Sequence, residues 1–306
     1  MAGERESAIQ AEQAGGEWTA DTRGGIAYTM GSTVTFACLD TLIKYLTAFY
    51  PVLELAWARY VFQIALLPFV LRGVRPRDLL RTKRPGLQIV RSMLLVSATL
   101  TFFFAVRSMP IADASAIGMV APLLITALAI PLLGEKVGRR RWTAVGIGMI
   151  GALVIIRPGF GVFDWAALLP LASATCYAFY QITTRILAGI DPPATTFFYS
   201  GVVGIVVLSV AAPFVWVWPS PGGWGLMIGL GLLGGGGHFM IIHALRRAQA
   251  SVLAPFSYIQ IVWVTALGYF VFGDFPDGFT ILGALIVISS GAYIAYRESV
   301  LKQTGS

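Results

Sequence analysis

The segment from Ala114 to Leu133 reads ASAIGMVAPLLITALAIPLL, and the segment from Ser251 to Phe272 reads SVLAPFSYIQIVWVTALGYFVF. Each segment has about the 20 residues without charge that an α-helix needs to cross the hydrocarbon core of a bilayer. An Ala-Ser pair lies at the start of each segment, Ala114-Ser115 and Ala250-Ser251. A glycine and an acidic residue follow the end of each, Gly134-Glu135 and Gly273-Asp274. The two segments therefore predict membrane helices at matching places in a duplicated chain.

Eight further apolar segments flank these two. The ten predicted spans are Ile26–Leu46, Leu53–Leu71, Leu87–Val106, Ala114–Leu133, Trp142–Ile156, Trp165–Ile186, Thr195–Val215, Trp224–Leu245, Ser251–Phe272 and Phe279–Tyr296. Five crossings are an odd number, so the second set must enter the membrane upside down relative to the first. The prediction is an all-α integral membrane protein, with ten transmembrane helices arranged as two inverted five-helix repeats at 26–157 and 164–297. Such inverted repeats are typical of transporters.

The composition excludes an ordinary soluble domain. Hydrophobic residues make up 57% of the chain and charged residues 12%, against about 25% charged residues in soluble proteins. The net charge of +7 would suggest nucleic-acid binding in a soluble protein. Here nearly all basic residues outside the spans fall in gaps on one side, and only Arg107 and Arg157 fall on the other. This asymmetry predicts a multi-pass protein of a bacterial inner membrane with both termini in the cytoplasm and no nucleic-acid partner.

The chain ends and the cysteines add little chemistry. Residues 1–25 are acidic and lack the apolar core of a signal peptide, so we expect a disordered cytoplasmic tail, with a second short tail at 298–306. Cys38 and Cys176 lie within spans and indicate small packing residues rather than a disulfide. No Cys/His spacing predicts a metal site, and we expect no metal and no cofactor.

The landmarks of the two halves recur in the same order. Ala105-Val106-Arg107 ends the third span and Ala244-Leu245-Arg246 ends the eighth, while Trp142 with Gly146 and Phe279 with Gly283 begin the fifth and tenth. Single matches of this kind are weak, but an ordered series indicates duplication. One chain then supplies both halves of a carrier, so a monomer is the simplest expectation.

Two motifs carry a resemblance to a known family. Leu55-Ala56-Trp57-Ala58-Arg59-Tyr60 resembles the second helix of an EamA repeat, including its arginine. Pro122, Leu132-Leu133-Gly134-Glu135 and Gly146 resemble the fourth and fifth helices of that repeat. The chain thus resembles, over about residues 26–296, the drug/metabolite transporter superfamily, and most of all its YddG-type exporters of aromatic and other apolar amino acids.

The resemblance implies a ten-helix secondary carrier of a small molecule, and not an enzyme. Two departures concern the second repeat. Gln260 and Ile261 stand where the ninth helix usually has a proline, and Asp274 replaces the usual glutamate. These departures weaken any transfer of gating details but leave the expected fold unchanged.

A carrier needs a cavity near the midplane, and the eighth span is the best candidate wall. Gly234, Gly235, Gly236 and Gly237 leave one side of this span bare, which suits a hinge or cavity as well as close helix packing. His238 follows them near mid-span, and Thr99 lies at the corresponding place in the third span. An intramembrane histidine is a candidate for binding or ion coupling, although a neutral, hydrogen-bonded histidine is the commoner case.

Four charged residues lie in the first two spans. Asp40 and Lys44 are four residues apart and are predicted to pair on one helix face, and Glu54 and Arg59 lie close to the same outer side. Unpaired charge in a bilayer costs at least about 2.5–3.5 kcal/mol, so the four should cluster or face water. They form either a structural ion-pair network or a site for a zwitterionic amino-acid head, in which the carboxylate would favour Arg59 or Lys44 and the ammonium Asp40 or Glu54.

Aromatic and amide side chains inside the spans complete the candidate cavity lining. Most buried aromatics only fill space, but tyrosine and tryptophan also require a partner for their polar atom. The candidates are Trp57, Tyr60, Tyr177, Tyr180, Gln181, Tyr258, Gln260 and Trp263. A wall of this kind suits a bulky, mostly apolar solute.

Three functions compete at this point. The first is a secondary transporter that exports small apolar or aromatic metabolites, most plausibly amino acids, by alternating access. The chain lacks the glycine-rich phosphate loop of ATP-driven pumps. The second is a multidrug or other metabolite carrier of the same fold. The third is a membrane-embedded enzyme, which the two histidines and few intramembrane carboxylates disfavour.

Overall fold

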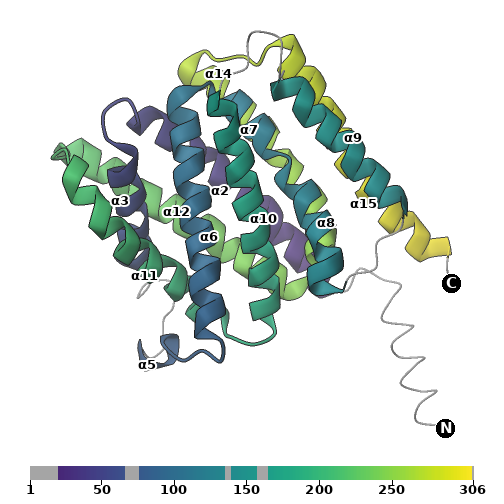
Figure 1. Cartoon of the computed structure of the whole chain (residues 1–306), viewed down its shortest axis with the longest axis horizontal. Coiled ribbons are helices and arrows are strands. Elements are labelled where there is room, and N and C mark those ends of the chain that lie inside the picture. Colours follow the sequence, from purple (N-terminus) through teal and green to yellow (C-terminus); the bar gives the residue numbers. More distant parts are fainter. Residues whose placement is uncertain (1–19, 66–75, 135–138, 157–164, 305–306) are drawn as a thin grey trace.

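The computed structural model describes residues 20–65, 76–134, 139–156 and 165–304, and these residues form helices without any β-strand (Figure 1). The first repeat contains α2 (Ala20–Leu46), α3 (Val52–Ala65), α5 (Pro76–Leu79), α6 (Pro85–Ser108), α7 (Ile111–Gly118), α8 (Ala121–Leu133) and α9 (Arg139–Ile156). The second contains η1 (Trp165–Ala167), α10 (Leu168–Ala188), α11 (Pro193–Ala211), η2 (Ala212–Val215), α12 (Pro221–Arg247), α13 (Ala250–Leu253), η3 (Ala254–Tyr258), α14 (Ile259–Phe272) and α15 (Gly278–Thr304).

Several helices of the described chain are long enough to cross a membrane. Six helical stretches are long and apolar enough to cross a bilayer by length and composition, and two shorter apolar helices accompany them at Gly146–Ile155 and Gly278–Ser290. The fold is therefore that of a multi-pass membrane protein, as predicted. Residues 1–19 of the predicted tail at 1–25 lie outside the described residues. From Ala20 onward it is helical, and Gly25 lies close to Ala244 and Ala248 at the end of α12.

Two predicted spans are not continuous helices. The fourth is divided between α7 and α8 at Met119 and Val120, and the ninth is divided into α13, η3 and α14. A proline lies next to each break: Pro122 in the first turn of α8, and Pro255 within η3. Proline has no backbone N–H and cannot make the usual bond to the carbonyl four residues earlier. Both breaks border the cavity described below.

The helices pair so that exchanging the two halves preserves every major contact. In each half the first helix lies against the third helix of the other half: α2 packs along α12, and α10 packs along α6. Likewise α3 packs on α12 as α11 packs on α6, and α10 packs on α8 as α2 packs on α14. Three further pairs are self-equivalent: α3 against α11, α9 against α15, and α7–α8 against α13–η3–α14. Figure 1 shows α9 and α15 together along one edge and α3 and α11 at the opposite edge. This arrangement is that of an inverted repeat.

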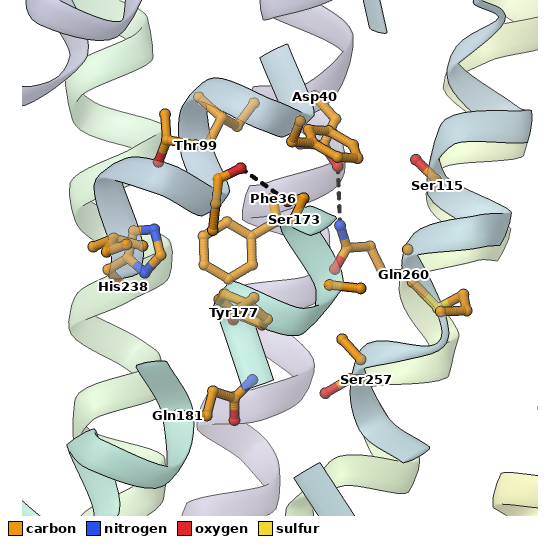
Figure 2. Close-up of a pocket in the computed structure, with 18 of the residues that line it drawn as sticks. Phe36, Asp40, Thr99, Ser115, Ser173, Tyr177, Gln181, His238, Ser257 and Gln260 are labelled. Carbon is orange, nitrogen blue, oxygen red and sulfur yellow. Dashed lines mark hydrogen bonds between the residues drawn. The ribbon is translucent and has the colours of Figure 1, made fainter. Parts of the chain in front are cut away.

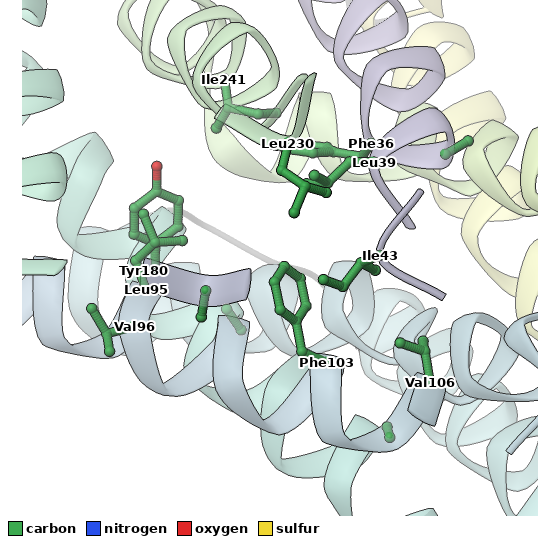
Figure 3. Packing of buried hydrophobic residues seen from close by; sticks show 14 of the residues in the cluster. Phe36, Leu39, Ile43, Leu95, Val96, Phe103, Val106, Tyr180, Leu230 and Ile241 are labelled. Carbon is green, nitrogen blue, oxygen red and sulfur yellow. The ribbon is translucent and has the colours of Figure 1, made fainter. Parts of the chain in front are cut away.

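The largest buried cluster joins α2, α6 and α12 through aliphatic and aromatic side chains (Figure 3). Close backbone approach makes this packing tight. A Cβ atom at Gly231 of α12 would lie 2.8 Å from the backbone carbonyl carbon of Phe62 in α3. A small residue is therefore required where α12 crosses α3.

A candidate substrate cavity between the repeats

One cavity lies between the two repeats and is bordered by both broken helices. Its charged and polar lining consists of Asp40 from α2, Arg59 from α3, Thr99 from α6, Ser115 from α7, Ser173, Tyr177 and Gln181 from α10, His238 from α12, Ser257 from η3 and Gln260 from α14. Its apolar lining includes Phe36, Leu95, Phe102, Phe103, Met119, Pro122 and Ile125. Figure 2 shows the labelled side chains around this space.

Seven of the residues proposed from the sequence line this cavity together. They are Asp40, Arg59, Thr99, Tyr177, Gln181, His238 and Gln260. The serines at 115, 173 and 257 were not proposed, because an isolated serine in an apolar span usually bonds a carbonyl of its own helix. Ser115 instead has a buried hydroxyl with no hydrogen-bond partner among the described residues. The Ser173 hydroxyl donates to the Ala98 carbonyl of α6 at 2.8 Å and ties α10 to α6.

Arg59 is a buried cation that lacks a full set of partners. Its side chain is 1% exposed, and its Nη2 donates to the Thr99 hydroxyl at 2.9 Å. Its guanidinium also lies over the ring of Tyr60, 4.1 Å from the centroid. Nε and Nη1 have no hydrogen-bond partner among the described residues, and no described carboxylate forms an ion pair with them. These two nitrogens carry three charged N–H groups without a partner in the described part of the chain, in a residue that lines the cavity. Such groups are suited to bind an anionic group.

Asp40 makes a different contact from the predicted one. Its Oδ2 accepts a hydrogen bond from Nε2 of Gln260 at 3.0 Å, which joins α2 to α14 (Figure 2). Lys44 donates to the Met109 carbonyl at 2.9 Å. Within the described chain Asp40 and Lys44 form no ion pair, so the predicted pairing is wrong. Spacing along a helix places two side chains on one face, but neighbouring helices supply nearer partners.

We expect the substitutions at these two positions to act independently. Asp40→Asn keeps an acceptor for Gln260, and Lys44→Met removes only the bond to Met109. The double variant should therefore show the sum of the two single changes in unfolding free energy to within about 0.5 kcal/mol. Thermal and denaturant unfolding of the three variants in one detergent measures this. A double variant more stable than that sum by about 1 kcal/mol or more would restore the pairing.

The other charged and aromatic candidates lie away from the cavity. Glu54 accepts from the Val217 backbone N–H at 2.9 Å, and Trp57 donates to the Ser209 hydroxyl at 2.9 Å. The four charged residues thus do not cluster, because each bonds a different helix or connection. Trp263 is 41% exposed on α14. Apolar residues occupy most positions around this helix, so the sequence gave no signal for which way Trp263 points. Tyr258 is buried in a separate apolar cluster.

Tyr60 and Tyr180 lie directly behind the cavity wall. The Tyr60 hydroxyl is 3.1 Å from the Thr99 hydroxyl, and the Tyr180 hydroxyl is 3.2 Å from Nδ1 of His238. Both tyrosine side chains are fully buried. They support residues that line the cavity rather than lining it themselves.

The glycines of α12 serve close packing. A Cβ atom at Gly234 would lie 2.8 Å from Nη1 of Arg59, and one at Gly235 would lie 3.1 Å from Gln63. Gly237 faces Phe36 of α2, whereas Gly236 faces mostly open space. The helix runs unbroken from Pro221 to Arg247. Of the two roles considered for these glycines, the structure favours packing, with Gly234 giving Arg59 its room.

Arg91 of α6 is a buried residue that the sequence did not single out. Its guanidinium donates to Thr184 at 2.7 Å, to the Ser200 hydroxyl at 2.6 Å, to the Thr196 carbonyl at 3.1 Å and to Tyr180 at 2.9 Å. All these partners are uncharged, so no acidic residue in the sequence marks the site. Arg91 joins α6 to α10 and α11.

Comparisons with known proteins agree with the fold. The S-adenosylmethionine uptake transporter of Rickettsia felis is 30% identical over 275 residues, covering 90% of this chain and 93% of that protein. A riboflavin transporter of Vibrio cholerae is 29% identical, covering 90% and 94%. The pseudopaline exporter CntI of Pseudomonas aeruginosa is 26% identical, covering 87% and 94%. A solved crystal structure with 20% identity and a TM-score of 0.69 covers 92% of this chain and 99% of its own and shows the fold alone.

These relatives correct the finer part of the sequence resemblance. They are named for S-adenosylmethionine, riboflavin and pseudopaline, so the likeness to exporters of aromatic amino acids is not supported by them. The broader likeness is confirmed, since residues 23–157 and 164–296 each match one family. With two matching repeats that span most of its length, the chain belongs to the EamA-like transporter family.

Proposed function

We propose that this protein is a secondary transporter that carries a small metabolite with an amino-acid head group through the cavity between its repeats by alternating access. One observation carries the proposal: Arg59 and Asp40 line the same cavity but form no ion pair with each other. Arg59 has two nitrogens with unused N–H groups, and Asp40 has a carboxylate with one amide partner. A substrate carboxylate at Arg59 and a substrate ammonium at Asp40 would satisfy both charges.

The rest of the cavity suits the body of such a solute. Phe36, Phe102, Phe103 and Met119 give it an apolar wall, and Tyr177 adds a ring with a polar end. Binding sites for small molecules are usually apolar with a few polar groups that fix orientation. The S-adenosylmethionine of one relative contains an amino-acid head group, which supports the proposal. A bulky apolar or aromatic amino acid would fit the same description.

Orientation and direction complete the proposal. The asymmetry of the basic residues supports a bacterial inner membrane as the location, with both termini on the cytoplasmic side. Relatives named for uptake and for export have the same fold, so the substrate gradient would set the net direction here. We expect the monomer to be the working unit, because one chain contains both repeats.

A second candidate is a carrier for metabolites without an amino-acid head. The riboflavin transporter of Vibrio cholerae favours it, because riboflavin has neither a carboxylate nor an ammonium group. This candidate would leave the buried charges of Arg59 and Asp40 without a matching group on the solute.

Transport into proteoliposomes tests the two candidates. Purified protein would be reconstituted, and the vesicles offered labelled methionine, phenylalanine, S-adenosylmethionine or riboflavin. We expect at least one of the first three to enter faster than into protein-free vesicles. Unlabelled methionine should slow this entry, whereas methionine methyl ester, which lacks the carboxylate, should not. Entry of riboflavin alone, or of none of the four, contradicts the proposal.

A further inference from the structure

His238 contacts Tyr180 behind the cavity wall. Nδ1 of its ring lies 3.2 Å from the Tyr180 hydroxyl, and the two rings meet edge to face at a centroid distance of 5.5 Å. The histidine ring also packs on Phe36, at a centroid distance of 4.9 Å. Nε2 has no hydrogen-bond partner among the described residues, and His238 lines the cavity (Figure 2). The ring is thus held on two sides and has one nitrogen left for a ligand.

Arg91 determines the direction of the hydrogen bond between Tyr180 and His238. Nη2 of Arg91 donates to the Tyr180 hydroxyl oxygen at 2.9 Å, and an arginine can only donate. The tyrosine oxygen is therefore an acceptor on that side, and its own hydrogen must go elsewhere. Nδ1 of His238 is the acceptor that the structure provides for it. If Nδ1 carried a hydrogen instead, the buried Tyr180 hydroxyl would lose this acceptor, at a cost of about 1–3 kcal/mol.

The charges around His238 favour an uncharged ring. Arg59 of α3 lines the same cavity, and Arg91 of α6 lies one hydrogen bond beyond Tyr180. Tyr60 of α3 and Tyr177 of α10 are neutral neighbours in the same region, and Asp40 of α2 bonds Gln260 instead. A third positive charge close to two guanidinium groups would be repelled. A neutral ring that accepts at Nδ1 must carry its hydrogen at Nε2.

We propose that His238 is a fixed, uncharged hydrogen-bond donor whose Nε2–H faces the substrate, and that Arg91 and Tyr180 are the residues that position it. Arg59 lines the same cavity, so both residues would bind an acceptor group such as a carboxylate. This role rests on the proposed function for its substrate, but the hydrogen position can be measured without any substrate. In this role His238 does not couple transport to protons, since its ring keeps one protonation state through the transport cycle.

Nuclear magnetic resonance of the histidine nitrogens tests the hydrogen position. The chain has two histidines, so His243→Gln leaves His238 as the only signal. With histidine labelled with ¹⁵N at Nδ1 alone, in lipid nanodiscs, we expect the shift of an unprotonated nitrogen, unchanged between pH 6 and pH 8. A protonated Nδ1 in this background overturns the proposal. Adding Tyr180→Phe removes the hydroxyl donor and should give a protonated or pH-dependent Nδ1, and an unchanged signal would exclude Tyr180 as the positioning residue.

Transport by two matched variants tests the donor itself. The side-chain nitrogen of glutamine can occupy the place of Nε2, whereas that of asparagine reaches only the place of Nδ1. For whichever of methionine, phenylalanine and S-adenosylmethionine the unmodified protein carries, His238→Gln should therefore keep most of the transport. His238→Asn should raise KM at least about tenfold, which corresponds to about 1.4 kcal/mol. Equal loss in both variants contradicts the donor role. If the unmodified protein carries none of methionine, phenylalanine and S-adenosylmethionine, the proposed function fails while the resonance result still stands.

Discussion

Replacing Arg59 with methionine should abolish transport and leave the protein at least as stable as before. Removing one member of a buried, hydrogen-bonded charge pair costs about 2–5 kcal/mol of binding, so transport at low substrate should fall at least about 30-fold. Stability should not fall, because Arg59 makes one hydrogen bond among the described residues and leaves two buried nitrogens unpaired. The measurements are initial transport rates in proteoliposomes and the thermal midpoint in detergent.

Arg91 provides the matched control for this experiment. It is also a fully buried arginine, but its guanidinium has four hydrogen bonds to uncharged groups. Arg91→Met should lower the unfolding free energy by at least about 1.5 kcal/mol, because a hydrogen bond to a charged group contributes about 1.5–3 kcal/mol. If Arg59→Met lowered the thermal midpoint as much as Arg91→Met, Arg59 would be a structural residue and the substrate role would be wrong.

Adding a single methyl group at Gly231 should strongly destabilise the helix packing. Its Cβ would lie 2.8 Å from the Phe62 carbonyl carbon and 2.9 Å from the Gln63 backbone nitrogen. Backbone atoms cannot rotate away as a side chain can, so α12 and α3 must separate. We expect Gly231→Ala to lower the unfolding free energy by about 1–3 kcal/mol or more, measured by thermal and denaturant unfolding.

Gly236 on the same helix offers the opposite expectation. The nearest atom to a Cβ there is Cγ2 of Thr35 at 3.9 Å, which is an ordinary contact. Alanine favours a helix over glycine by up to about 1 kcal/mol, so Gly236→Ala should be neutral or stabilising. A loss at both positions would indicate that α12 needs flexible glycines rather than close contact, and would support the hinge role.

The sequence predicted most of the fold because lipid restricts the choices. Backbone groups in a bilayer must bond within the segment, so long apolar runs become helices. The breaks at Met119–Val120 and at η3 were missed, since hydropathy is the same for a continuous and a broken apolar helix. The prolines at 122 and 255 were the signal. Pro255 lies near the start of its predicted span, where proline is compatible with an intact helix, but Pro122 lies in the middle of Ala114–Leu133, where it indicates a break.

The candidate site was predicted in part. Asp40, Arg59 and His238 were identified because an ionisable residue inside a span is unusual, and the structure places all three on one cavity. The partners of Asp40 and Lys44 come from distant segments, Gln260 and Met109. The spacing of residues along one helix gives no information about partners on other segments. Arg91 is likewise a charged residue inside a predicted span, Leu87–Val106, so the sequence did contain a signal for it. Its partners, hydroxyl and carbonyl groups of α10 and α11, could not be predicted from the sequence.

The two repeats differ in what holds their corresponding helices together. Arg91 joins α6 to α10 and α11 by hydrogen bonds, whereas the corresponding group of α12, α2 and α3 meets through glycine contacts. In an inverted repeat with identical halves, a two-fold rotation would convert the inward-open state into the outward-open state, so the two states would have equal energy. These halves are unequal, so one of the two states should dominate at rest, and a bias of about 1.4 kcal/mol already gives a tenfold excess. The cavity of the empty carrier would then open mainly to one side of the membrane, and substrate would bind from that side.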